Sequence, residues 1–244
     1  MNLFYAPDFN LDIDISKNFD SRSWSLNKQE SHHAVHVLRL NINSPVEITN
    51  GKGGFFSGVI SKTDSKVCQI QILSAKIIEP RPYYIRILIA PTKNSDRFEW
   101  FLEKSTEIGV DEIIPLYCQN SERKVFNQER MEKVVIASMK QSGQAYLPKI
   151  HPLENFSTFS SKNLEGTGLI AHCREGKKNN LKTIFGSTKQ KIFNILIGPE
   201  GDFSKEEVEV MVSKGYIPIS LGKSRLRTET AALFVVARFS ELAE

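Results

Sequence analysis

Two segments near the C-terminus combine glycine with charged residues directly after apolar runs typical of strands. They are LIGPEGDFS (196–204) and SLGKSRLRTETAA (220–232). Each passes from a strand through a loop into a helix without a side-chain nucleophile. Gly198, Gly201 and Gly222 lack a β-carbon, so their backbone N–H and C=O groups can approach a bound ring closely. Such loops could bind an adenine through main-chain hydrogen bonds, although two ordinary strand-to-helix turns leave the same pattern.

The second of these loops is also cationic. Lys223, Arg225 and Arg227 lie within SLGKSRLRT (220–228) without an acidic neighbour. The whole chain has a formal net charge of +4, and residues 1–80 contribute nothing to it because they hold eight basic and eight acidic residues. A local cationic loop suits a phosphate-bearing partner. Composition alone is explained more simply by a solvated basic loop.

Other chemistries are excluded because their patterns are missing. The turn after the first strand of the α/β region, APTKNSD (90–96), has no glycine, which argues against a Rossmann-type nucleotide site. No G-x-x-x-x-G-K-[ST] motif occurs, which removes P-loop chemistry. In HHAVH (32–36), His32 and His36 lie one helical turn apart, but His33 replaces the glutamate of a zinc-protease motif. We therefore expect no metal site.

Length and composition predict a soluble globular protein of one or two domains. The 244 residues are 40% hydrophobic and 25% charged. The longest apolar runs, such as AALFVVA (231–237), are far shorter than the roughly 18 residues of a membrane span. The N-terminal MNLFYAPDFNLDIDI lacks the basic flank of a secretory signal, and the three cysteines form neither a disulfide framework nor a metal-ligand pair. We expect a cytoplasmic protein with no membrane association.

The first part of the chain, residues 1–75, predicts a small β-rich domain with one helix. Strand-like runs at 45–49 and 55–61 flank a glycine-rich turn, which is typical of a hairpin. Residues 66–74 alternate as a half-buried strand does, and residues 28–40 have a helical pattern. Two prolines within residues 76–84 indicate a linker.

From residue 85 onward, strand and helix patterns alternate. Strands are expected at 85–90, 112–116, 169–172, 192–197 and 217–221, and helices from Asn94 or Ser95 to Gly109 and over 128–141, 204–215 and 228–242. The helix at 204 begins with a capping box, Ser204 followed by Glu207. This alternation predicts an α/β domain with a mostly parallel sheet covered on both faces.

The two glycine loops resemble the knot motifs of the SPOUT methyltransferase superfamily, and most closely those of the 16S rRNA (uracil-N3)-methyltransferase family (RsmE type). Further matching segments are HHAVHVLRL (32–40), the glycine-rich hairpin, EKSTEIGVDEIIPL (103–116) and KQSGQAYLP (140–148), and together they cover most of the chain in the family's order. The resemblance implies a PUA-like β-barrel that binds RNA over residues 1–75. It also implies a SPOUT methyltransferase domain with a C-terminal trefoil knot over residues 85–244.

The resemblance also implies functions for individual residues. It places S-adenosylmethionine against Leu196, Gly198, Gly201, Leu221, Gly222 and Leu226. Lys223 and Arg225 become candidates for RNA binding. Three positions depart from the family's pattern: Asp202 stands where many members have glycine, Ser224 precedes Arg225 in place of a basic-then-aliphatic pair, and Gln144 stands where arginine is common. His172 and Cys173 either border the cofactor pocket or simply pack at the end of a strand.

The chemistry of methyl transfer to uracil defines two catalytic candidates. The methyl group of a sulfonium is already activated, so the enzyme mainly aligns it with the attacking atom. Uracil N3 must lose its proton, and a cation near O2 or O4 would stabilise the resulting anion. Arg227 is our candidate for that cation. Glu229 is either the base or, as we favour, a residue that orients Arg227 or stabilises the N-terminus of the final helix.

We therefore predict an S-adenosylmethionine-dependent enzyme that methylates N3 of a uridine in 16S rRNA of the small ribosomal subunit. Two alternatives stay open: a related SPOUT enzyme that methylates the ribose 2′-oxygen, and a non-catalytic RNA-binding protein that retains the fold. Members of the superfamily are typically homodimers. The final helix agrees with this because it is apolar nearly all round and therefore expected to be buried, either within the subunit or at an interface.

Overall fold

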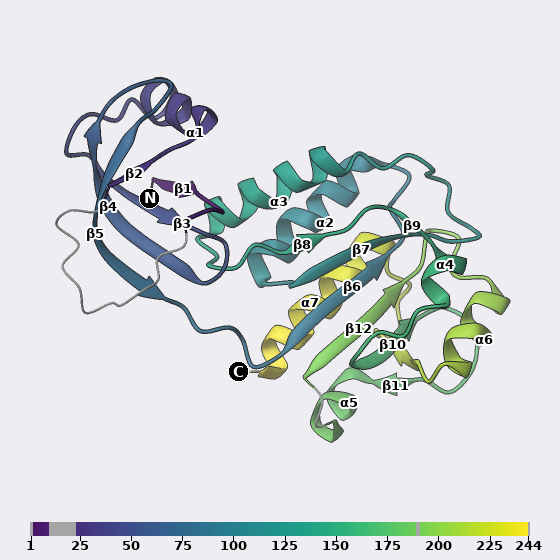
Figure 1. Ribbon diagram of the computed structural model, residues 1–244. Coiled ribbons are helices and arrows are strands. Elements are labelled where there is room, and N and C mark those ends of the chain that lie inside the picture. The colour runs from purple at the N-terminus through teal and green to yellow at the C-terminus, as the bar shows by residue number, and fades with distance from the viewer. Residues whose placement is uncertain (1, 10–22, 189–190, 244) are drawn as a thin grey trace. The chain divides into compact units, whose positions relative to one another are not determined.

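The structure is a computed structural model of the chain and describes residues 2–9, 23–188 and 191–243. The chain forms two compact units, each with its own β-sheet (Figure 1). The first comprises Met1–Pro80 and Met139–Leu147, and the second comprises Arg81–Ser138 and Pro148–Glu244. Over the described ranges, no helix has both the length and the apolar character needed to cross a membrane.

The first unit contains a five-stranded sheet in the order β1-β3-β4-β5-β2. Its strands are β1 (Leu3–Tyr5), β2 (Ser23–Ser25), β3 (Pro45–Thr49), β4 (Gly54–Lys62) and β5 (Gln69–Ile77). β1 pairs with β3 in parallel, and the other pairs are antiparallel. The predicted hairpin is confirmed as β3 and β4. Its turn contains Gly51 and Gly53 at φ angles of 69° and 95°, where residues with a β-carbon are disfavoured.

The helix predicted over 28–40 is shorter than expected. α1 (Lys28–His32) continues into a single π-helical turn, η1 (His33–Val37). Asn27 caps α1 by accepting a hydrogen bond from the Glu30 amide. Beyond the turn, Arg39 adopts a positive φ of 52°, a conformation that an α-helix cannot contain, so the helical path ends there.

The second unit is built on an eight-stranded sheet in which every pair is parallel. The order is β11-β13-β10-β12-β6-β7-β8, with β9 beside β7. The strands are β6 (Tyr84–Ile89), β7 (Glu112–Tyr117), β8 (Lys149–Ile150), β9 (Glu154–Asn155), β10 (Thr167–Ala171), β11 (Asn179–Asn180), β12 (Ile192–Ile197) and β13 (Ile217–Ser220). The parallel sheet predicted from the alternating pattern is therefore confirmed.

Six helices accompany this sheet: α2 (Ser95–Ile108), α3 (Gln128–Ser142), α4 (Phe156–Ser160), α5 (Leu181–Ser187), α6 (Lys205–Ser213) and α7 (Thr228–Ala243). The residues that end them act as predicted. Asn94 caps α2, and Gly109 ends it in the left-handed conformation. The capping box of α6 is formed, because Ser204 and Glu207 each accept a hydrogen bond from the other's backbone amide. α4 and α5 were not predicted.

Alternation along the strands separates two apolar layers. On one face, Leu88, Ile114 and Leu196 join a buried cluster that includes side chains of α4 and α6. On the opposite face of β12, Phe193 packs against Phe239 of α7, with ring centroids 4.6 Å apart and the ring planes tilted by 49°. Helices thus cover both faces, as the continuous apolar strands require.

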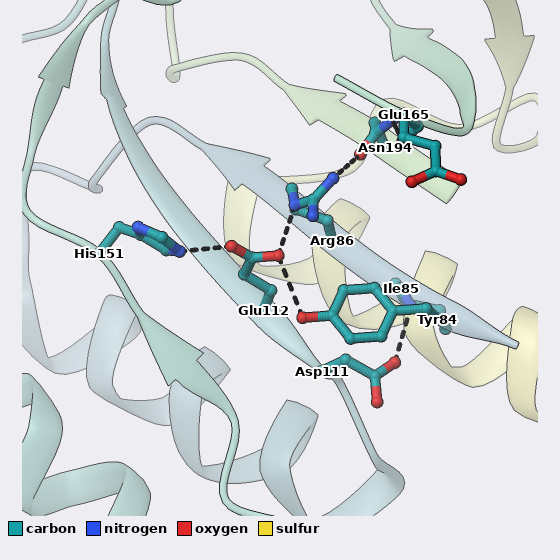
Figure 2. A network of polar contacts seen from close by, with 8 residues as sticks. All are labelled: Tyr84, Ile85, Arg86, Asp111, Glu112, His151, Glu165 and Asn194. Atoms are coloured by element: carbon teal, nitrogen blue, oxygen red, sulfur yellow. Dashed lines mark hydrogen bonds and ion pairs between the residues drawn. The ribbon is translucent and has the colours of Figure 1, made fainter. Parts of the chain in front are cut away.

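Toward the amino ends of the same strands, the first face carries a polar network instead of apolar side chains (Figure 2). Arg86, Glu112 and Asn194 are direct register partners on β6, β7 and β12. Arg86 Nε lies 2.5 Å from Glu112 Oε2, and the guanidinium also donates to Asn194 Oδ1. His151 and the Tyr84 hydroxyl bind the same carboxylate. This network was not predicted. Within it, the largely buried charges of Arg86 and Glu112 neutralise each other.

The network shifts the ionisation of its members. Burial alone would raise the pKa of Glu112, but the hydrogen bonds and charges of Arg86 and His151 outweigh it, so the pKa is lower than its ordinary value. Burial, followed by the nearby Glu112 charge, raises the pKa of Tyr84 to about 12. The carboxylate is therefore held ionised and the phenol neutral near pH 7.

We expect Glu112→Ala to lower the free energy of unfolding at pH 7 by about 3 kcal/mol, because Arg86 would lose its countercharge in a largely buried place. Since the folded state lowers the pKa of Glu112 below 4.5, its charge stabilises the fold above that pH, and this contribution is lost as the pH falls further. The difference between variant and wild type should therefore shrink under acidic conditions. Urea denaturation at about pH 7 and about pH 4 measures both effects.

The matched control is Glu129→Ala, which removes an exposed ion pair with Lys133 on α3. We expect this variant to be nearly as stable as wild type, because water screens the pair. Equal stability of Glu112→Ala and wild type at neutral pH would contradict a stabilising role of the network.

Candidate cofactor and RNA site

The carboxyl ends of three neighbouring strands surround a cavity in the second unit. Ala171 of β10 lies in register with Ile197 of β12 and Ile219 of β13, so the three strands end side by side. The cavity has a volume of about 530 Å³ and is lined by residues of the loops that follow these strands. In an open parallel sheet, this edge is where ligands bind.

Most of the predicted site residues come together at this cavity. Its lining includes Gly198, Leu221, Gly222 and Leu226 of the predicted cofactor residues, together with the cations Lys223, Arg225 and Arg227. The two predicted loops, 196–204 and 220–228, start about twenty residues apart in the sequence, and both border this single cavity.

Three predicted residues lie away from the lining. Leu196 is fully buried in the apolar cluster beneath the cavity. A β-carbon on Gly201 would lie 3.0 Å from Asn120 Cβ, so this glycine faces the loop after β7. Glu229 is 5% exposed in the first turn of α7, and its Oε2 has no hydrogen-bond partner. Among the described side chains, no hydrogen bond or ion pair joins Arg227 to Glu229.

The lining glycines are required for two different reasons. A β-carbon on Gly198 would lie 3.0 Å from the ring of Phe203, which is fully buried, so there the constraint is packing inside the loop. Gly222 has open space around it but a φ of 122°, a conformation that side chains rarely adopt. The second loop therefore depends on the backbone freedom of Gly222.

Hydrogen bonds hold the first loop against its neighbours. The hydroxyl of Thr228 donates to the carbonyl of Gly198 at 2.9 Å, and Arg225 Nη2 donates to the carbonyl of Glu200 at 3.2 Å. Glu200 Oε1 in turn accepts from the Lys93 amide at 3.0 Å. Sequence reasoning missed Thr228, whose only signal was a hydroxyl at the entry to the final helix.

The electrostatics of the cavity favour anionic groups. Lys178, which was not predicted, joins the three cations of the second loop, while Glu200 and Asp202 are the acidic residues of the lining. His172 also lines the cavity, and its Nδ1 is buried without a hydrogen-bond partner. Burial, then the charge of Lys178, lowers the pKa of His172, so its ring is neutral near pH 7.

This arrangement is suited to binding a ligand. The cavity is lined by backbone groups, apolar side chains and cations. Its one thiol belongs to Cys173, which is exposed and follows the end of β10. Within the described part of the chain, no cluster of three His, Cys, Asp or Glu side chains could hold a metal ion. Such a site suits a transfer reaction in which the ligand brings its own reactive group and the protein mainly aligns it.

Comparison with known proteins agrees with this geometry. Residues 79–240 match the RNA methyltransferase domain family, and residues 26–73 match the RNA methyltransferase PUA domain family. The chain is 30% identical over 213 residues to the ribosomal RNA small subunit methyltransferase E of Rickettsia conorii, covering 85% of this chain and 86% of that protein. It is 25% identical over 233 residues to the Bacillus subtilis protein of the same name, covering 91% of each.

Solved structures share the fold over nearly the whole chain. A probable rRNA-methyltransferase from Porphyromonas gingivalis superposes with a TM-score of 0.82 at 37% identity, covering 99% of this chain and 98% of that one. Ribosomal RNA small subunit methyltransferase E from Neisseria gonorrhoeae, solved bound to S-adenosylmethionine, has the same TM-score at 24% identity and the same coverage. The resemblance seen in the sequence is confirmed: an α/β methyltransferase unit whose glycine loops enclose one cavity follows a PUA domain, and the chain belongs to the ribosomal RNA small subunit methyltransferase E family.

Proposed function

We propose that this protein transfers a methyl group from S-adenosylmethionine to N3 of a uridine in 16S rRNA of the small ribosomal subunit. The observation that carries the proposal is the cavity at the ends of β10, β12 and β13, formed by the glycine loops of a chain in this family. The N. gonorrhoeae relative, bound to S-adenosylmethionine, supports the choice of cofactor. An rRNA substrate is also consistent with action in the cytoplasm.

The residues present fit such a cofactor. The cavity volume is in the range of small-molecule sites, and its walls combine apolar side chains with backbone polar groups. We assign binding to the backbone at Gly198 and Gly222 and to the side chains of Leu221 and Leu226. When bound, S-adenosylmethionine supplies a methyl group that is already activated, which explains why the cavity needs no nucleophile of its own.

We assign the electrostatic part of catalysis to Arg227. It is exposed at the cavity and directly precedes Thr228, which is anchored to Gly198. A positioned cation stabilises the uracil anion that forms when N3 loses its proton. Burial of Glu229 in the first turn of α7 supports a helix-terminal role for that carboxylate, where the helix dipole favours a negative charge. It lies outside the cavity lining, which argues against its action as the base.

We also propose that the second unit contains the trefoil knot of the SPOUT fold. β13 lies beyond β10 in the sheet, whereas α7, which follows it, packs on α2, β6 and β12 near the centre. The chain therefore returns across the ends of the strands, past the loop that Thr228 contacts at Gly198. A passage of this kind supports threading of the C-terminus through an earlier loop.

The two families matched support a different function for each of the two domains. We propose that the PUA-like domain, residues 1–75, binds RNA and that residues 85–244, after a linker at 76–84, carry out methyl transfer. Lys223 and Arg225 at the cavity are then the phosphate contacts of the catalytic unit. Arg225 already donates to the Glu200 carbonyl, so part of its hydrogen-bonding capacity is used to hold the loop.

Nucleoside mass spectrometry of 16S rRNA tests the reaction. We expect a strain that lacks this protein to lose one 3-methyluridine, and the purified protein to restore it in the presence of S-adenosylmethionine. Loss of a 2′-O-methylated nucleoside would instead show that the enzyme modifies ribose. Unchanged rRNA would contradict the proposed methylation.

The catalytic role of Arg227 separates from RNA binding in kinetics. We expect Arg227→Ala to lower kcat by about 100- to 1,000-fold while RNA affinity changes little, because the charge matters most in the transition state. Lys223→Ala and Arg225→Ala should instead weaken RNA binding and its salt dependence with little effect at saturation. Single-turnover methylation at saturating RNA and cofactor measures the difference. A wild-type rate for saturated Arg227→Ala would refute the assignment.

We further propose a homodimer that buries the outer sides of α2 and α7. These helices pack together, yet Trp100 is 42% exposed and Phe234 is 39% exposed. Phe234→Glu should therefore give a monomer in light scattering, because a charge would enter the apolar interface. Val125→Glu, at a residue that is 73% exposed before α3, is the control and should leave the dimer intact. A fully active wild-type monomer would rule out the dimer.

A further inference from the structure

Asp202 occupies a backbone conformation that favours glycine. Its φ is 64°, and among the residues that the structure describes only Arg39 and Asn43 are other non-glycine residues with positive φ. Aspartate tolerates this region better than most residues because its short side chain can bond locally, but it has no advantage over glycine in backbone freedom. The presence of a carboxylate here therefore calls for a reason beyond backbone shape.

The side chain supplies that reason, because it joins two walls of the cavity. Asp202 Oδ2 accepts a hydrogen bond from the backbone amide of Cys173 at 2.9 Å, and Oδ1 accepts one from the amide of Phe203 at 2.9 Å. Cys173 follows the end of β10, whereas Phe203 belongs to the loop after β12. Both carboxylate oxygens are thus used by amides from the two sides of the cavity.

A second contact crosses the same gap in the opposite direction. Arg174 Nη2 donates to the carbonyl of Phe203 at 3.0 Å. Arg174 Nε also donates to this carbonyl, at 3.3 Å. Three hydrogen bonds, two from Arg174 and one that Asp202 accepts, therefore attach the segment after β10 to the loop after β12. Hydrogen bonds that involve a charged group are stronger than neutral ones.

We propose that Asp202 is a positioning residue that holds the loop after β10 against the loop after β12 and thereby sets the affinity for S-adenosylmethionine. The inference rests on the proposed function, since it takes the cavity as the cofactor site. Without the carboxylate, only Arg174 attaches the two walls to each other, and cofactor binding must order them further at a cost in free energy. The cost falls on cofactor binding, because the walls, not the reacting atoms, are what Asp202 contacts.

Two substitutions separate the carboxylate from the backbone conformation. Asp202→Gly keeps the positive φ without strain but removes both acceptors, so we expect affinity for S-adenosylmethionine to fall roughly tenfold. Asp202→Asn keeps the shape and one acceptor oxygen, so its loss should be intermediate. If Asp202 served only to adopt the positive φ, glycine would bind the cofactor as well as the wild type does.

Titration calorimetry with S-adenosylmethionine and S-adenosylhomocysteine distinguishes a clamp from a direct charge contact. A clamp shapes the cavity for both ligands, so both affinities should fall by similar factors in Asp202→Gly. Direct attraction to the sulfonium would weaken only S-adenosylmethionine, since S-adenosylhomocysteine carries no charge on sulfur. That second outcome, or unchanged affinity for both ligands, would overturn the proposal.

Hydrogen exchange gives a readout that is independent of methylation. In the folded ligand-free protein, Asp202→Gly should speed exchange of the Cys173 and Phe203 amides, because both lose their acceptor. The matched control is Asn43→Gly, which replaces another positive-φ residue, at 69°, far along the sequence in the first unit. In this control, the exchange rates of the Cys173 and Phe203 amides and the affinity for the cofactor should both be unchanged. Unaltered exchange of both amides in Asp202→Gly would overturn the clamp.

Gly222→Val shows whether a failure belongs to the site or to Asp202. Valine is strained at the φ of 122°, so the second loop must move and cofactor affinity should fall. If Gly222→Val binds normally, the cavity is not the cofactor site, and the proposed function of these loops fails together with the inference. If Gly222→Val binds weakly and Asp202→Gly binds normally, the site stands and the inference alone is wrong.

Discussion

The attachment of the loop Gly198–Ser204 to the ends of the neighbouring strands is the constraint on which the site depends. This loop accepts hydrogen bonds from Lys93 after β6, from Asn120 after β7, from the segment after β10 and from the entry to α7. Two of these four bonds are accepted by backbone carbonyls, those of Gly198 and Asp202, and two by the carboxylates of Glu200 and Asp202. These hydrogen bonds fix the loop in one position relative to the neighbouring strand ends. A ligand that brings its own reactive methyl group mainly needs a rigid binding surface that aligns this group with the attacking atom.

On one face of the sheet, the strands β6, β7 and β12 carry polar side chains near their amino ends and apolar side chains two residues further along. On one face, β6 presents Arg86 and then Leu88, β7 presents Glu112 and then Ile114, and β12 presents Asn194 and then Leu196. Each of these strands therefore begins in the polar network and continues in the apolar core, and β12 ends at the cavity. Because alternate residues face opposite sides of a sheet, a slip of one residue would bury Arg86 without Glu112, so the network also specifies the register.

Sequence reasoning succeeded where a local rule decides the structure. The capping box at Ser204, the cap at Asn94 and the hairpin glycines each act within a few residues, and each was predicted. Between residues 149 and 187 it predicted β10 but missed β8, β9, α4, β11 and α5, because strands of two residues and short helices have too few positions to show a period. At the site, alternation places Leu196 in the core once the register is known, whereas the resemblance alone had placed it against the cofactor. The hydrogen bond between the Asp202 carboxylate and the Cys173 amide joins residues 29 positions apart, and no local pattern indicates it.

The junction between Arg227 and Thr228 shows how a folded chain can support an exposed charge. A free arginine side chain loses much rotamer entropy when it is held in one place, which opposes its use as an electrostatic catalyst. Here the next residue is buried and bonded to Gly198, and the helix that follows packs its apolar side on the sheet. The backbone of Arg227 is therefore fixed by its neighbour, while its guanidinium stays exposed at the cavity. The free energy needed to position Arg227 is thus supplied when the chain folds, and little reorganisation is left for the moment of reaction. An electrostatic role requires this kind of preorganisation.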